Sequence, residues 1–281
     1  MSRQATEAVK FWRDPGLDNT EMLHARYITH AFSRHTHDGY AIGVIESGVE
    51  AFTYRGATYQ APAGSVVIIH PGEVHTGYAG IPEGWAYRML YPDASLIQRA
   101  AAEVNPAAHH LPFFPQPVIQ DRWLAEQLRR MHQAIEASDL SLERESRFLW
   151  TLAQLIVRHA DDRPIIPPIS QEHAAVQTAR DYIERHYAEA ISLNQLAQIT
   201  HLKPLRLLRV FQREVGLPPH AFLVQVRLTH AKRLLRLGEP IAQVAIDTGF
   251  TDQSHLNRHF KRLTGITPGQ YAAGWLRERK S

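Results

Sequence analysis

The sequence contains no cysteine among its 281 residues. This absence excludes a disulfide framework, a thiolate zinc site and a cysteine nucleophile, and it suits a reducing cytoplasm. No run approaches the roughly 18 apolar residues that a membrane span requires. The polar residues 1–10 lack the apolar core of a signal peptide. We therefore expect a cytoplasmic protein, and its hydrophobic content of 44% is ordinary for a globular chain.

The sequence has no large excess of positive or negative charge, because its net charge is only +3. The charged residues are nevertheless unevenly distributed along the chain. Residues 171–281 contain 16 Lys and Arg against 9 Asp and Glu, whereas residues 1–170 contain 15 against 19. A basic C-terminal part beside an acidic N-terminal part indicates that only the former meets a polyanion.

Residues 25–92 show the pattern of short β-strands. The segments 40–46, 51–54 and 65–70 are rich in β-branched and aromatic residues. Turn-forming pairs and triplets separate them: Asp38-Gly39, Ser47-Gly48, Arg55-Gly56, Pro62-Ala63-Gly64 and Pro71-Gly72. Many short strands at even spacing favour a sandwich or barrel.

Two amphipathic helices are predicted next, over residues 120–136 and 142–159. The first carries an apolar stripe at helical spacing, formed by Leu124, Leu128, Met131 and Ile135. The short break between the helices predicts a hairpin. Such a hairpin either covers one face of the sheet or pairs with its copy in a homodimer, and the sequence leaves both open.

Prolines mark the boundary between two domains. Residues 161–171 contain Pro164, Pro167 and Pro168 in a polar setting, and proline stops helices and stiffens the chain. We therefore predict a strand-rich domain that includes the helical hairpin over residues 1–160, a linker over 161–171 and an all-helical domain over 172–281. The expected fold class is α+β.

The C-terminal domain divides into short helices with clear end signals. Ser192 and Gln195 form a capping box, Gly216 and Gly238 end helices, and Pro240 is expected at the first position of the next helix. The predicted helices cover residues 176–187, 193–199, 203–215, 219–237, 241–247 and 252–263, with a final helix capped by Thr267-Pro268.

A short helix, a turn and a longer helix occur twice in this domain. Ala197 and Ala245 lie 48 residues apart, and Phe211 and Phe260 lie 49 apart, so the second unit has one extra residue in its turn. Polar and basic side chains gather on the longer helix of each unit. A plain helical bundle does not explain that gathering, whereas a pair of helix-turn-helix units that read DNA does.

Residues 175–273 closely resemble the DNA-binding domain of AraC-family transcription regulators. The resemblance rests on two stretches of sequence, the connecting helix and the second unit. The first is Gly216-Leu217-Pro218-Pro219 with Arg227-Leu228, Ala231 and Leu234-Leu235; the second is Ile241, Val244-Ala245, Gly249-Phe250, Asp252-Gln253-Ser254, Leu256, Arg258, Phe260-Lys261, Gly265, Thr267-Pro268 and Tyr271. The first unit matches more loosely, with His201 where the second has Gly249.

The resemblance implies a sequence-specific activator that is not an enzyme and whose partners are promoter DNA and RNA polymerase. The start of a recognition helix enters the major groove, where arginine can bond guanine at two positions. We predict base contacts from Leu205, Arg206, Arg209, Gln253, Ser254, His255, Asn257 and Arg258. Phosphate contacts are expected from Lys203, Arg213, Lys261 and Arg262.

Residues 30–90 resemble the cupin-type sensor domain of the same family. His35 and His37 share one face of a predicted strand, and His75 follows a later strand. In the family such a pocket binds a small-molecule effector, with donors in an apolar cavity. The predicted effector-binding residues are His35, His37, Tyr40, Glu73 and His75, with Ile42 and Val44 as apolar lining; His70 is expected to be structural.

A metal at His35, His37 and His75 is the weaker interpretation, and no cofactor is expected. Metal-binding cupins place a glutamate four or five residues after the second histidine, where this chain has Ala41 and Ile42. Glu46 lies too far along the strand for that role. The same absence weakens the main alternative, a cupin metalloenzyme with an accessory helical domain. An architectural DNA protein is disfavoured because it has no use for a strand-rich pocket domain.

Overall fold

The computed structural model describes residues 6–105, 110–161 and 172–278. Two compact units form: Met1–Ala137 with Arg147–Pro168, and Ser138–Ser146 with Ile169–Ser281. The predicted linker, residues 161–171, lies outside the described residues apart from its first residue. None of the described helices is long and apolar enough to span a membrane.

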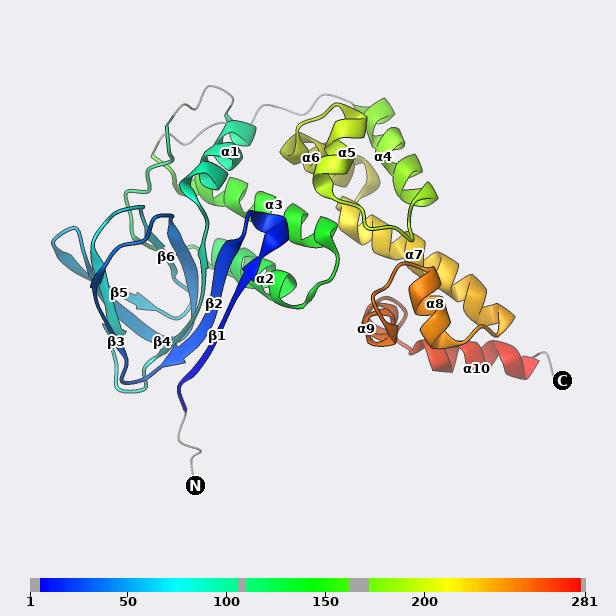
Figure 1. Cartoon of the computed structure of the whole chain (residues 1–281), viewed down its shortest axis with the longest axis horizontal. Helices are drawn as coiled ribbons and strands as arrows, with labels where there is room; N and C mark the ends of the chain where they lie inside the picture. Colours follow the sequence, from blue (N-terminus) through cyan, green and yellow to red (C-terminus); the bar gives the residue numbers. More distant parts are fainter. Residues whose placement is uncertain (1–5, 106–109, 162–171, 279–281) are drawn as a thin grey trace. The chain divides into compact units, whose positions relative to one another are not determined.

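The described residues of the first unit form nine strands. Their bounds are β1 Ala8–Asp14, β2 Thr20–Tyr27, β3 Ala31–His35, β4 Ala41–Tyr54, β5 Ala57–Pro62, β6 Val66–Ile69, β7 His75–Ala79, β8 Trp85–Tyr91 and β9 Val118–Ile119. The main path runs β1-β2-β8-β4-β6-β9, and β5 and β7 also pair with β4. The predicted α+β class is confirmed, with the described strands in an open, branched and curled sheet (Figure 1).

Strand β4 is the central element of this sheet. Its first half pairs with β6 and β8, and its second half pairs with β5 and β7. The predicted turn at Ser47-Gly48 is wrong, because β4 continues through it with a bulge between Ile45 and Ser47. Gly48 has φ +72°, and a Cβ there would lie 1.9 Å from the backbone oxygen of Gly84, so only glycine fits.

Three helices pack on the outer face of the sheet: α1 Ala94–Val104, α2 Arg122–Ala137 and α3 Ser141–His159. The stripe Leu124, Leu128, Met131 and Ile135 is at most 5% exposed and belongs to one core with Ile42. The hairpin therefore covers the sheet. The hypothesis that this stripe forms a dimer interface is wrong, because the unit's own strands already bury it.

The second unit is helical, as predicted. Its helices are α4 His173–Arg185, α5 Leu193–Thr200, α6 Pro204–Val215, α7 Pro219–Leu237, α8 Ile241–Asp247, α9 Gln253–Thr264 and α10 Pro268–Glu278. Helix α7 contacts α4 and α6 in the first half of this unit and α8 and α10 in its second half. Figure 1 shows α7 as the long helix that joins these two halves. The Ser192 hydroxyl caps α5 by accepting from the Gln195 N–H, whereas Pro240 is the N-cap of α8 rather than its first residue.

The segment Ser138–Ser146 packs with the second unit, which differs from the predicted domain boundary. Leu140 is buried in one apolar core with Leu228 and Phe250. The Glu145 carboxylate accepts a hydrogen bond of 2.7 Å from the N–H of Leu193, at the start of α5. This contact supplies a partner for one of the free N–H groups that every helix start exposes.

The two helix-turn-helix units are structurally equivalent at their turns. His201 after α5 and Gly249 after α8 both adopt left-handed backbone conformations, with φ of +54° and +80°. They lie 48 residues apart, like the small residues Ala197 and Ala245. The predicted repeat is therefore present in the backbone as well as in the sequence.

Gly249 is the turn residue for which we expect the largest penalty on substitution. Its added Cβ would lie 2.7 Å from the backbone oxygen of Ala188, whereas a Cβ at Gly216, with a similar φ, meets nothing within 4 Å. Gly216→Ala should cost about 1–2 kcal/mol for the left-handed backbone alone. Gly249→Ala should cost a further ~1–3 kcal/mol for the steric overlap. Urea denaturation of both variants measures the difference, and equal losses would contradict the crowding.

Candidate DNA-reading helices and effector pocket

Helix α9 presents one polar face and one buried face. The Asp252 carboxylate accepts from the His255 N–H at 2.7 Å and caps the helix start. The exposed or half-exposed face consists of Gln253, Ser254, Asn257, Arg258, Lys261 and Arg262. These positions lie on one side of a helix, as a groove-reading surface requires.

His255 does not belong to that face. Its side chain is 2% exposed, lies edge-on to Phe250 and points its Nδ1 toward Thr251. The predicted base contact by His255 is wrong, because packing against the core buries the ring.

Helix α6 provides the second polar face, with one correction. Leu205 is 1% exposed and packs inward, so its predicted base contact is wrong. Arg206 and Arg209 are half-exposed and Arg213 and Lys203 are exposed, and the Arg206 Nε donates to Glu172 at 2.7 Å. Burial, and then the neighbouring Arg206 and Arg213, lower the pKa of Arg209. Cations that repel one another on one face favour the approach of an anion.

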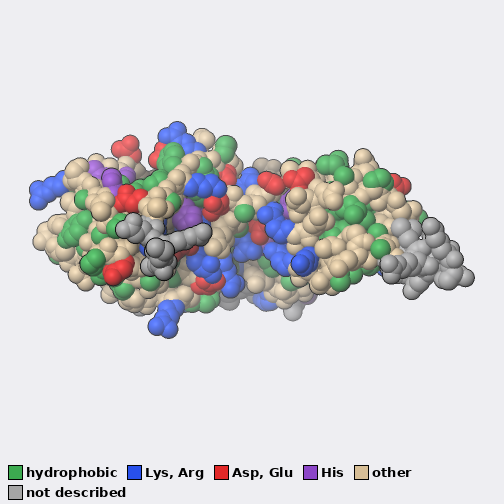
Figure 2. Space-filling model, turned by 90° about the horizontal axis from the view of Figure 1, so that it is seen from below, with side chains coloured by type: hydrophobic (Ala, Val, Ile, Leu, Met, Phe, Trp, Pro, Cys, Tyr) green, Lys and Arg blue, Asp and Glu red, His purple; other side chains and the backbone are tan. Residues whose placement is uncertain are grey.

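Lys and Arg side chains are exposed on the face of the molecule drawn in Figure 2, interspersed with Asp and Glu. Exposed cations give sequence-independent attraction to phosphate. Sequence must then be read by the few side chains that reach base edges.

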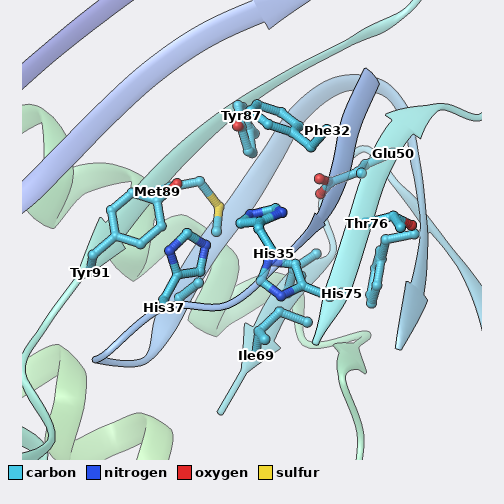
Figure 3. A pocket seen from close by; sticks show the side chains of 14 residues that line it. Phe32, His35, His37, Glu50, Ile69, His75, Thr76, Tyr87, Met89 and Tyr91 are labelled. Atoms are coloured by element: carbon cyan, nitrogen blue, oxygen red, sulfur yellow. The ribbon is translucent and has the colours of Figure 1, made fainter. Parts of the chain in front are cut away.

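The three predicted histidines converge in the first unit. His35 at the end of β3 pairs in register with His75 at the start of β7, and His37 follows two residues later. The ring centroids lie 4.2 Å apart for His35 and His75, 4.9 Å for His35 and His37, and 5.0 Å for His37 and His75. They line a pocket of about 470 Å³, counting its open mouth, and Figure 3 shows their imidazoles facing one another.

The other predicted pocket residues lie elsewhere. Tyr40 is 1% exposed and lies in the outer core, the core that the sheet shares with the helices. Its O–H donates to the Pro112 carbonyl at 2.7 Å. Ile42 and Val44 belong to the same outer core. The Glu73 side chain pairs with Arg55, and only its backbone carbonyl contacts the pocket, through His75. The expectation that these four side chains line the pocket is wrong.

Comparison with known protein families supports both the histidine-lined pocket and the helix-turn-helix units. The model of the AraC-like ligand binding domain matches residues 19–152, and a helix-turn-helix domain model matches residues 196–274. The HTH-type transcriptional regulator YbfI of Bacillus subtilis is 31% identical over 243 residues, covering 86% of this chain and 87% of its own. This chain belongs to the AraC family of transcriptional regulators.

Other AraC-family relatives match over similar lengths. The transcriptional activator RhaS of Enterobacter sp. is 25% identical over 253 residues, covering 87% of this chain and 88% of its own. The arabinose operon regulatory protein of Salmonella typhimurium is 26% identical over 254 residues, covering 84% of each chain. Because the chain carries both the ligand-binding domain and the helix-turn-helix domain of this family, it is a ligand-responsive regulator that binds DNA.

The pocket of this AraC-family chain contains one acidic residue that the sequence analysis missed. Glu50 is 7% exposed, and burial raises its pKa to about 8. One carboxylate oxygen has no hydrogen-bond partner among the described residues. In Figure 3 its carboxyl group lies on the same side of the pocket as His35 and His75.

The bulge in β4 explains why Glu50 was missed. The sheet has a second buried core, the inner core, which is separate from the core that it shares with the helices. Before the bulge, Ala41 and Ile45 face this inner core, and after the bulge Phe52 and Tyr54 face it. Inward positions thus change from odd to even numbers, and Glu50 becomes an inward position. The only sequence signal was Ser47-Gly48, which also reads as a turn.

Two of the pocket histidines, His37 and His75, are poor bases. Burial, and then His75 and His35, lower the pKa of His37 to about 4, and burial lowers the pKa of His75. Both rings are therefore neutral near pH 7. A neutral imidazole offers a nitrogen lone pair to a hydrogen-bond donor or a metal ion.

One buried cation of the family signature has a structural role. Arg227 on α7 is 2% exposed and donates to the backbone oxygens of Tyr187 and Glu189 at 2.6 and 2.8 Å. Its guanidinium also lies 5.9 Å from the Phe250 ring centroid. Arg227 therefore joins α7 to the chain between α4 and α5 and to the turn of the second helix-turn-helix unit, and it is not available to DNA.

Proposed function

We propose that this chain is a homodimeric, non-enzymatic transcription activator of the cytoplasm, which binds promoter DNA and RNA polymerase in response to a small-molecule effector. The observation that supports it most is the pair of equivalent polar faces on α6 and α9, in a chain whose other unit carries a histidine-lined pocket. Activation is proposed because relatives over most of the chain include activators named RhaS.

Base reading falls to the side chains that remain on the two polar faces. From α6 these are Arg206 and Arg209, and Arg206 must exchange its Glu172 partner for a base. From α9 they are Gln253, Ser254, Asn257 and Arg258. Lys203, Arg213, Lys261 and Arg262 bind phosphate, where charge matters more than geometry.

Regulation requires that the effector prefers one arrangement of the protein. The chain passes between the two units after Ala137, Ser146 and Pro168. Helix α2 leads into the first of these passages and packs on the sheet that carries the pocket. We propose that the segment Ser138–Ser146, held by Leu140 and Glu145 in the second unit, transmits the state of the pocket. A coupling of about 1–3 kcal/mol changes DNA affinity some 5- to 150-fold.

Selection of bound DNA from a random-sequence pool tests the DNA-binding part of the proposal. The full chain should enrich one recurring sequence, and the Arg209→Ala, Arg258→Ala double variant should not. Screening small metabolites for altered affinity to that sequence then tests the pocket. His37→Ala should keep basal binding and lose the response. Failure of the wild-type chain to enrich any sequence would overturn the proposal, and a full response in His37→Ala would remove the histidines from the sensor.

A further inference from the structure

We propose that His35, His37 and His75 together bind one divalent first-row transition metal ion, with the Glu50 carboxylate beside it. The inference rests on the proposed role of this pocket as the ligand site and names the chemistry of what binds there. It replaces the expectation of a metal-free pocket, because that expectation depended on the absence of a nearby glutamate.

The three imidazoles lie close enough together to share one metal ion after small ring rotations. One ring nitrogen from each histidine lies within 4.8 Å of the corresponding atoms of the other two. Three nitrogens bound to a tetrahedral ion at about 2.0–2.1 Å lie about 3.4 Å apart. Small ring rotations close that difference, since β3 and β7 hold His35 and His75 opposite each other in the sheet.

The hydrogen bonds of two rings leave the correct nitrogen free for a metal. The His35 Nδ1 lies 2.8 Å from the Ser33 carbonyl, and the His75 Nδ1 lies 3.1 Å from the Glu73 carbonyl. A carbonyl oxygen only accepts, so each Nδ1 must carry the proton and each Nε2 keeps its lone pair. Backbone carbonyls fix metal-binding histidines in just this way.

Glu50 supplies the charge that such a site requires. Its side chain is buried, and its Oε2 has no hydrogen-bond partner within the described part of the chain. A bound dication would favour the ionised form of this buried carboxyl group, whose Oε2 has no other partner among the described residues. The three imidazole nitrogens suit zinc, iron, cobalt or nickel better than magnesium or calcium.

Cobalt titration of the full chain, freed of any affinity tag, tests the site. The wild type should bind one Co²⁺ per chain with a visible absorption band, and Zn²⁺ should displace it. His37→Ala and His75→Ala should lose the band. Glu50→Gln should weaken binding about 10- to 100-fold, as loss of a supporting group typically does. His24→Ala is the matched control, because His24 is a half-exposed histidine of the same sheet that pairs with Glu46 instead, and it should bind like the wild type.

The rise in melting temperature on adding Zn²⁺ gives a second readout and shows whether each variant folds. Metal binding that His24→Ala keeps and His37→Ala loses supports the proposal, even if no change in DNA binding follows. Wild-type protein that binds no Co²⁺ or Zn²⁺, or binds equally well in a folded His37→Ala variant, overturns it. Those results leave DNA selection and the effector screen unaffected, so the two proposals fail separately.

Discussion

Replacing Arg258 with alanine should weaken binding to the selected operator by about 1–3 kcal/mol and relax base preference in one of its two segments. Arg258 lies on the exposed face of α9, one turn after Ser254 and beside Asn257. A guanidinium there can bond guanine at two positions in the major groove. Arg209→Ala should have a similar cost and relax the other segment, because α6 belongs to the first unit.

Two further variants separate base reading from other effects. Lys261→Ala should weaken binding to all sequences alike and lower the slope of the salt dependence by about one. His255→Ala should reduce stability without changing base preference, since the ring packs against Phe250. Affinities measured on a panel of single-base operator variants give the base preferences, a salt series gives the slope for Lys261→Ala, and urea denaturation gives the stability of His255→Ala. If Arg209→Ala and Arg258→Ala lose base preference at the same positions, α6 and α9 do not read separate segments of the operator.

Replacing Leu128 with alanine should lower the free energy of unfolding by about 2–5 kcal/mol. Leu128 is 1% exposed in the core between α2 and the sheet, so its removal leaves a cavity that the surrounding side chains fill only in part. Leu128→Glu should prevent the first unit from folding, because it buries an unpaired charge. Urea denaturation followed by circular dichroism measures both.

Trp123→Ala on the same helix is the matched control. Trp123 is 43% exposed and contacts Arg158 at its surface, so its loss should cost at most about 1 kcal/mol. A folded Leu128→Glu protein that has changed only from dimer to monomer would contradict the structure and restore the dimer-interface hypothesis.

The helical domain was predictable because its signals are local. Caps at Ser192 and Asp252, stops at Gly216 and Gly238, and apolar spacing set each helix within a few residues. The errors concern which face a residue takes. Leu205 and His255 were placed in the groove because both stand near the start of a recognition helix. Leu205 is one turn before Leu208, and His255 is one turn before His259, and all four are buried.

The sheet was less predictable because its register depends on partners far away in the sequence. Strands β1 and most of β2 lie outside the predicted region, and among the described strands β1 pairs only with β2. The bulge in β4 lies next to the close approach of Gly84 to Gly48, which no local pattern reveals. That bulge moves Glu50 inward, whereas the convergence of His35, His37 and His75 was predictable from a cupin-like layout.

Hydroxyl-radical footprinting on a DNA that carries one half-site of the selected operator, the part that one chain of the proposed homodimer reads, tests the central claim most directly. The two polar faces belong to two helix-turn-helix units joined by α7, so one chain should protect two segments on one face of the DNA, about 34 Å apart. Arg209→Ala should weaken protection of one segment first and Arg258→Ala that of the other. A single protected segment, unchanged in position by either substitution, would contradict reading by two units.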